Sequence, residues 1–124
     1  MALLVREKSY SPYSGHKVGA AILTSDGKIY TGCNVENSSF GATVCAERVA
    51  IQKAVSEKGV ILLKSVMVVT QAASHWPPCG MCRQVLAEFG QDFWVHTANT
   101  QGRLETYSFQ ELFPKGFTPN YLKP

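Results

Sequence analysis

Pro78-Cys79-Gly80-Met81-Cys82 carries the strongest structural signal in this 124-residue chain. Cysteines at positions i and i+3 of a helix share one face, so both thiolates can reach the same metal ion. A C-x-x-C pair alone also occurs in half of a zinc finger or in a redox pair. A redox pair usually follows a strand near the start of a thioredoxin-like βαβ pattern, which Pro77-Pro78 before Cys79 does not resemble. We therefore interpret Cys79 and Cys82 as metal ligands at the start of a helix.

A second chemical group, Cys45-Ala46-Glu47, lies at another predicted helix start. In the first turn of a helix the Cα–Cβ bonds lean toward the N-terminus, so Cys45 and Glu47 can both reach over the open end. Three cysteine ligands leave the fourth tetrahedral position of Zn²⁺ open for water, which is the catalytic arrangement. The pattern predicts one zinc ion per chain, held by Cys45, Cys79 and Cys82, with Glu47 as the acid/base group.

The segments around these motifs alternate between strand and helix patterns. We expect strands over 17–24, 28–33, 62–70, 92–98 and 103–107, and helices over 2–9, from an N-cap at Thr43 to Lys58-Gly59, from Cys79 to Gly90, and after a capping box of Ser108 and Glu111. Asp26-Gly27 predicts a hairpin turn between the first two strands. Helices that alternate with strands predict an α/β protein with a central five-stranded mixed sheet, a three-layer α/β/α sandwich.

Composition restricts the class of protein further. A chain of 124 residues with 45% hydrophobic and 17% charged residues predicts a single folded domain over 1–124. The net charge of +3 is too small and dispersed for a nucleic-acid track. The longest uncharged stretch, which includes Ser65–Met81 and ends at Cys82, contains His75 and Pro77-Pro78, which argues against a membrane span. The apolar run Leu3-Leu4-Val5 is short for a signal peptide, so we expect a cytoplasmic protein with reduced thiols.

The paired motifs Cys45-Ala46-Glu47 and Pro78-Cys79-Gly80-Met81-Cys82 resemble those of the zinc deaminases, which attack C4 of cytosine. The chain is most similar to the small, three-cysteine, free-nucleoside cytidine deaminases, through Ser11-Pro12-Tyr13-Ser14, Val18-Gly19-Ala20-Ala21 and Gly32-Cys33-Asn34-Val35-Glu36-Asn37. The resemblance runs from about Ser9 to Phe117. It implies the cytidine-deaminase-like fold, a homotetramer with shared active sites, and hydrolysis of the C–N bond of cytidine or 2′-deoxycytidine to the uracil nucleoside plus ammonia, in pyrimidine salvage.

The resemblance also implies a role for each matching residue. Cys45, Cys79 and Cys82 match the zinc ligands, Glu47 the proton shuttle, Asn34 and Glu36 the partners of the sugar hydroxyls, the Ala46 backbone a pyrimidine contact, and Phe117 an aromatic that reaches a neighbouring subunit's site. His16 occupies the position where many relatives place a Phe against the base. Arg48 matches an arginine of the three-cysteine members, and a guanidinium there would offset the net negative charge of zinc with three thiolates.

Three alternatives remain open from the residues alone. The first is deamination of an antibiotic nucleoside of the blasticidin type, and the second is deamination of cytosine in a polynucleotide. The third is a non-catalytic structural zinc site in which Cys33 is the fourth ligand. We do not expect His75 or His96 to bind the metal, and we interpret Trp76 and Trp94 as packing residues.

Overall fold

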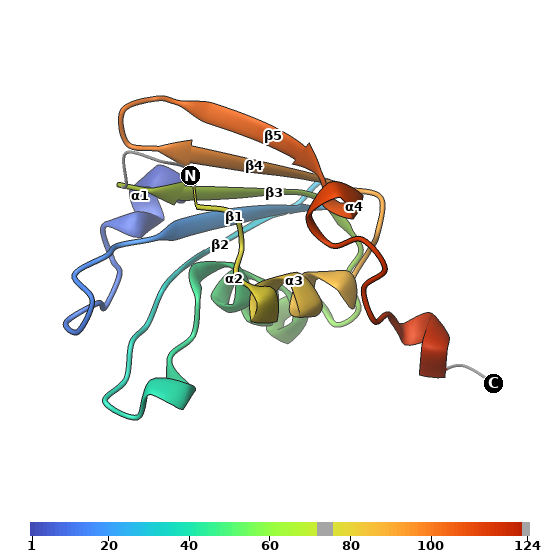
Figure 1. Ribbon diagram of the computed structural model, residues 1–124, viewed down its shortest axis with the longest axis horizontal. Coiled ribbons are helices and arrows are strands. Elements are labelled where there is room, and N and C mark those ends of the chain that lie inside the picture. The colour runs from blue at the N-terminus through green and yellow to red at the C-terminus, as the bar shows by residue number, and fades with distance from the viewer. Residues whose placement is uncertain (72–75, 123–124) are drawn as a thin grey trace.

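The protein is built around one five-stranded mixed sheet with the strand order β2-β1-β3-β4-β5 (Figure 1). The computed structural model describes residues 1–71 and 76–122. The strands are β1 (Gly19–Thr24), β2 (Ile29–Cys33), β3 (Leu63–Thr70), β4 (Trp94–Asn99) and β5 (Leu104–Ser108), and the α-helices are α1 (Ala2–Arg6), α2 (Ala46–Lys58), α3 (Gly80–Ala87) and α4 (Phe109–Leu112). Two short 3-10 helices, η1 (Phe40–Ala42) and η2 (Pro119–Leu122), complete the described elements. Among the described strand pairs, β3 and β4 are parallel and the other three pairs are antiparallel, which confirms the predicted mixed sheet.

Two glycines show that helices cover both faces of the sheet. A Cβ on Gly32 would lie 2.5 Å from the Ala46 carbonyl oxygen, so only glycine lets α2 pack this closely on β2. A Cβ on Gly19 would lie 2.0 Å from the Ala2 carbonyl oxygen of α1. Gly32 pairs with Ala20, the neighbour of Gly19, so the two glycines face opposite sides of the sheet. The three-layer sandwich is confirmed, with α2 and α3 together on one face (Figure 1) and the short α1 on the other.

The main hydrophobic core lies between the sheet and the helices α2 and α3. Ile22, Val66 and Val95 contribute fully buried side chains from three neighbouring strands, and Ile51 and Leu86 contribute buried side chains from the two helices. The same core extends to the start of β4 and to α4, where the rings of Phe93 and Phe109 stack with centroids 4.4 Å apart. The predicted capping box of Ser108 and Glu111 is confirmed at the start of α4.

The start of α2 differs from the prediction in a way that matters for the site. The N-cap is Cys45 and not Thr43, because Val44 forms an antiparallel bridge with Val35 and keeps the chain extended. The Thr43 hydroxyl instead accepts a hydrogen bond from the Asn37 backbone N–H at 3.1 Å. Helix α3 begins in the same manner, with Cys79 in extended conformation as its N-cap. Both helices therefore present a cysteine at their N-terminal boundary.

Within residues 1–71 and 76–122, no helix has the length and apolarity that crossing a membrane requires. His75, which we do not expect to bind the metal, lies outside the described residues. His96 lies on β4, where its Nδ1 is 2.9 Å from the Thr106 hydroxyl of β5 and away from the cysteines of α2 and α3.

Candidate active site

Three cysteines from two helices converge at one point. The Sγ atom of Cys79 lies 3.4 Å from that of Cys82 and 3.9 Å from that of Cys45. All three sulfur atoms lie within 4.8 Å of one another, so a single ion can contact all of them. Soft thiolates at this spacing are the ligands that zinc prefers in proteins. The residues present therefore fit a zinc ion, as the sequence predicts.

The environment of the cluster favours a thiolate at Cys45. Hydrogen bonding to the Cys82 thiol, together with the Arg48 guanidinium, lowers the pKa of Cys45 to about 5. Arg48 Nη2 donates to Cys45 Sγ at 3.5 Å and to the Thr43 carbonyl oxygen at 3.3 Å. The same hydrogen bond to Cys45, with burial, raises the pKa of Cys82. The opposite shifts favour the thiolate at Cys45 and keep the proton on Cys82, and metal binding would displace that proton.

A fourth protein ligand is absent from this group. Among residues 1–71 and 76–122, no other His, Cys, Asp or Glu joins Cys45, Cys79 and Cys82 within ligand distance. Cys33 is half-buried at the end of β2, on the strand face that pairs with Gly19 and faces α1. The cysteines of the cluster lie at the N-terminal ends of α2 and α3, on the opposite face of the sheet, which these helices cover. The described residues therefore give no support to a closed four-cysteine structural site.

Glu47 occupies the first turn of α2 beside this cluster. Its side chain is only 5% exposed, so the carboxyl group has left bulk water. Burial raises the pKa of Glu47 to about 7, and the negative charge of Cys45 acts in the same direction. A carboxyl group with this pKa exchanges a proton readily at neutral pH, which is what general acid–base catalysis requires.

A pocket of about 290 Å³ opens onto the cysteines and Glu47. Of the residues predicted from the sequence, seven line it: His16, Asn34, Glu36, Cys45, Ala46, Glu47 and Cys79. Cys82 lies fully buried behind Cys79, and Arg48 reaches the site through Cys45. A larger cavity, of about 560 Å³, lies beside the C-terminal segment and includes none of the predicted site residues in its lining. We assign the chemistry to the smaller pocket because it alone of the two borders the cysteine cluster.

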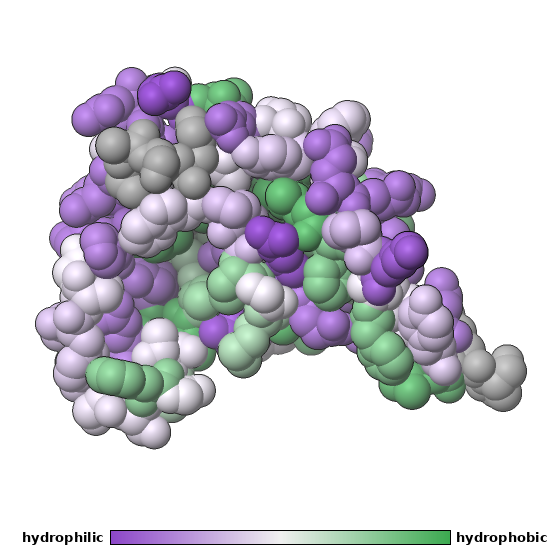
Figure 2. All heavy atoms as spheres, viewed as in Figure 1, coloured by the Kyte–Doolittle hydropathy of each residue, from purple (hydrophilic) through white to green (hydrophobic). Residues whose placement is uncertain are grey.

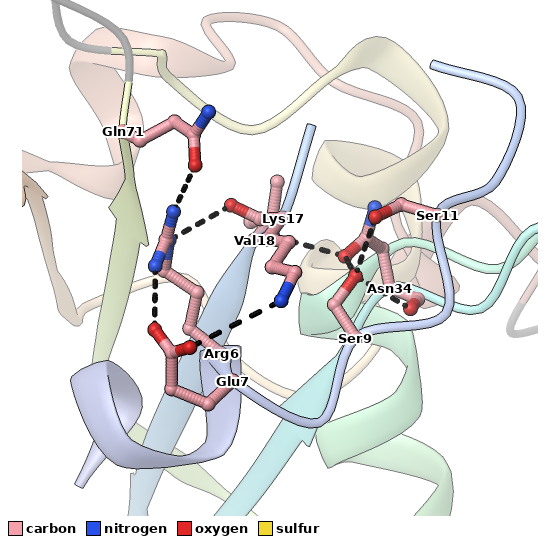
Figure 3. A network of polar contacts seen from close by, with 8 residues as sticks. All are labelled: Arg6, Glu7, Ser9, Ser11, Lys17, Val18, Asn34 and Gln71. Carbon is pink, nitrogen blue, oxygen red and sulfur yellow. Dashed lines mark hydrogen bonds and ion pairs between the residues drawn. The ribbon is translucent and has the colours of Figure 1, made fainter. Parts of the chain in front are cut away.

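Asn34 holds the pocket wall in place through its amide group (Figure 3). Its Oδ1 accepts hydrogen bonds from the Val18 backbone N–H, at 2.9 Å, and from the Ser9 hydroxyl. Its Nδ2 donates to the His16 carbonyl oxygen at 2.8 Å. On the other side of the same segment, the buried Arg6 donates from Nε to the Lys17 carbonyl oxygen at 3.1 Å. Of the Asn34 side chain, one N–H proton remains for a ligand.

Glu36 lines the same end of the pocket as an ionised acceptor. Its Oε1 accepts from the backbone N–H groups of Tyr13, at 2.9 Å, and Ser14, at 3.1 Å. The Ser14 hydroxyl donates to Oε2 and is the main cause that lowers the pKa of Glu36. A carboxylate held by fixed donors can accept a hydrogen bond from a sugar hydroxyl without rearrangement.

One outcome differs from the sequence interpretation. Trp76, interpreted as a packing residue, lines the pocket and packs against His16 with ring centroids 5.0 Å apart. Only its place three residues before Cys79 could have indicated this. Phe117, expected at the site of a neighbouring subunit, does not line the pocket of its own chain; it is 53% exposed and stacks on Tyr121 with centroids 5.4 Å apart.

Comparison with known proteins gives a consistent result. Residues 1–97 match the family model described as the cytidine and deoxycytidylate deaminase zinc-binding region. A cytidine deaminase of Sporosarcina psychrophila is 46% identical over 114 residues, 91% of this chain and 83% of that one. The crystal structure of a Burkholderia pseudomallei cytidine deaminase superposes with a TM-score of 0.88 at 42% identity, covering 94% of this chain and 93% of the other. A blasticidin-S deaminase of Bacillus cereus is 34% identical over 112 residues, 85% of this chain and 79% of that one.

Proposed function

This chain belongs to the cytidine and deoxycytidylate deaminase family, and we propose that it hydrolyses cytidine or 2′-deoxycytidine to the uracil nucleoside plus ammonia. The observation that carries this proposal is the convergence of Cys45, Cys79 and Cys82 beside the buried Glu47, at the end of a pocket. Pyrimidine salvage is the process that such a reaction serves.

Each half of the site has a separate task in this reaction. Cys45, Cys79 and Cys82 would hold the zinc, which when bound lowers the pKa of a coordinated water to about 7 and so supplies a nucleophile at neutral pH. Glu47 takes a proton at its carboxylate, delivers it to N3 of the base, and later protonates the departing amino group. The Ala46 backbone lies in the pocket lining next to Glu47, where it can contact the same ring.

The other end of the pocket suits the sugar of a neutral nucleoside. Glu36 offers a fixed acceptor and Asn34 one remaining donor proton, so a sugar hydroxyl can donate to the first and accept from the second. Among the described lining residues there is no Lys or Arg to bind a phosphate group. This composition favours a free nucleoside over a nucleotide or a polynucleotide strand.

An absorbance assay over a panel of cytidine, 2′-deoxycytidine, cytosine, blasticidin S and single-stranded DNA tests the substrate class. We expect turnover of the two nucleosides, because each places a base at the cysteine end and a sugar at Glu36. Cytosine should react poorly, since it forfeits the sugar contacts that position the base. Preferential turnover of blasticidin S would favour the activity named for the Bacillus cereus relative, and inactivity on the whole panel would reject the proposal.

Arg48→Ala should keep the fold and lower zinc affinity or turnover by about 10–100-fold, the usual effect of losing a group that supports a metal ligand. Arg48 donates to Cys45 Sγ, so its removal takes away a positive charge that offsets the negative charge of the thiolates. Zinc affinity measured by competition with a chelator, and kcat measured at saturating zinc, separate the two effects. Arg48→Lys is the matched control, because lysine keeps the positive charge but lacks the planar set of donors of the guanidinium. Unchanged kinetics and zinc content in Arg48→Ala would reject this role.

The exposed apolar surface of the C-terminal segment supports a homotetramer in which subunits share active sites. Hydrophobic surface, green in Figure 2, runs along this segment as it projects from the body beyond α4. Phe117, Tyr121 and Leu122 are each more than half exposed, although their side chains are large and largely apolar. In an assembly, Phe117 could complete the pocket of a neighbouring subunit, which is the role that the family resemblance implies for it.

A further inference from the structure

The pocket wall that carries His16 also contains Trp76, a residue to which no role has been assigned. The rings of His16 and Trp76 meet there edge to face, with centroids 5.0 Å apart and an interplanar angle of 68°. Both residues line the pocket, and Trp76 remains 38% exposed. Trp76 is not part of the hydrophobic core cluster, so its ring is not needed to hold the sheet and helices together. A large aromatic ring that lines a pocket and lies outside the core cluster is available to a ligand.

The position of this pair along the pocket indicates which part of a ligand it meets. Trp76 lies three residues before Cys79, which belongs to the metal end, and His16 lies two residues after Ser14, which hydrogen-bonds Glu36 at the sugar end. Because the two rings contact each other, they span the region between the two ends. A nucleoside whose C4 lies at the cysteines and whose sugar lies at Glu36 must place its pyrimidine ring in that region.

The surrounding chemistry suits a flat aromatic base. Val18, Val68 and Pro77 add apolar surface to the same pocket. The Asn34 amide fixes the backbone on both sides of Lys17, through the Val18 N–H and the His16 carbonyl oxygen, and so holds the segment that carries the His16 ring. An indole ring offers a π face and an apolar area that any pyrimidine can pack against.

We propose that Trp76 is a specificity-determining residue that packs, together with His16, against the pyrimidine ring of the bound nucleoside. This inference rests on the proposed function, since it places the base between the metal end and the sugar end. It assigns a substrate contact to a residue that neither binds the metal nor transfers a proton in the reaction.

Tryptophan fluorescence tests the contact directly, because the chain contains only Trp76 and Trp94. Trp94 lies on β4 next to the core residue Val95, so it faces away from the pocket and is the matched control. The zinc-loaded protein is titrated with uridine, the product, which is not consumed. We expect the emission to change on saturation in the wild type and in Trp94→Phe, and to stay constant in Trp76→Phe. A signal that survives in Trp76→Phe, or disappears in Trp94→Phe, would overturn the proposal.

Kinetics with cytidine give a second, independent measurement. Trp76→Ala should raise KM by roughly 5- to 150-fold, the range that loss of one base–aromatic contact produces. Because the contact exists in both ground and transition states, kcat should change far less than KM. Trp76→Phe should raise KM much less than Trp76→Ala, since it keeps an aromatic ring. A purely structural role would lower the melting temperature and leave KM unchanged, and that result would contradict the proposal.

Failure of this inference can be distinguished from failure of the proposed function. Wild-type protein that deaminates cytidine, with KM unchanged in Trp76→Ala and Trp76→Phe, refutes only the role of Trp76. Wild-type protein without activity on any nucleoside refutes the proposed function, and the uridine titration then still reports whether Trp76 contacts a pyrimidine. Zinc content, measured in every variant, shows whether a change before Cys79 has disturbed the metal ligands instead.

Discussion

Glu47→Gln should bind zinc like the wild type and lose cytidine turnover by about 10²–10⁴-fold, the contribution expected of a general acid–base group. The substitution is nearly isosteric, so the 5%-exposed side chain keeps its volume within the first turn of α2. The amide can neither take a proton from the attacking water nor return one to the leaving amino group. The three sulfur ligands are untouched, since Glu47 is not a member of the cysteine group. The expected result is therefore a folded, zinc-loaded protein that has lost most of its turnover of cytidine.

The measurements are zinc content, melting temperature and kcat, made on the same preparation. Glu57→Gln is the matched control, because Glu57 lies on the same helix but is exposed to solvent. It should retain wild-type turnover. Glu47→Gln with full activity would refute the proton-transfer role, whatever the zinc content. Loss of zinc from Glu47→Gln would instead assign the carboxylate to the metal, in conflict with the ligand group that the structure shows.

The chemistry of the site was more predictable from sequence than its walls. Cys45, Glu47, Cys79 and Cys82 could be predicted because each lies at a helix start, where side chains lean toward the open N-terminal end, and because the paired motifs resemble those of the zinc deaminases. The order of strands and helices followed from hydrophobic periodicity and turn residues for the same reason. Each motif and each element is made of residues that are close in sequence, and the structure confirms the fold that they imply and brings the two motifs together.

What sequence could not provide depends on contacts between distant segments. The bridge between Val35 and Val44 moves the N-cap of α2 from Thr43 to Cys45, and no local propensity at Thr43 reveals that bridge. Trp76 becomes a pocket residue only because the segment before α3 meets the loop that carries His16. Hydrophobicity alone gives an aromatic residue the same interpretation in a core and in a binding pocket.

Cys82→Ala should lose both zinc and cytidine turnover, whereas Cys33→Ala should keep both. Cys82 is fully buried, and its sulfur lies 3.4 Å from that of Cys79, so its removal leaves two ligands where tetrahedral binding needs three from the protein. Alanine at Cys33 removes only a half-buried sulfur on the sheet face toward α1. Zinc per chain by elemental analysis, and turnover with and without added zinc, measure the difference.

This pair of variants separates a catalytic from a structural metal site. A structural site closed by four cysteines would lose zinc equally in both variants, because each sulfur would then be a ligand. A catalytic site with three protein ligands responds to Cys82 alone. Removal of zinc from the wild type with a chelator should therefore abolish turnover while the circular dichroism spectrum persists, since the core cluster of Ile22, Val66, Leu86 and Val95 contains no cysteine. Turnover should return when zinc is added, and unfolding of the metal-free protein, or zinc loss in Cys33→Ala, would show that the metal holds the fold instead.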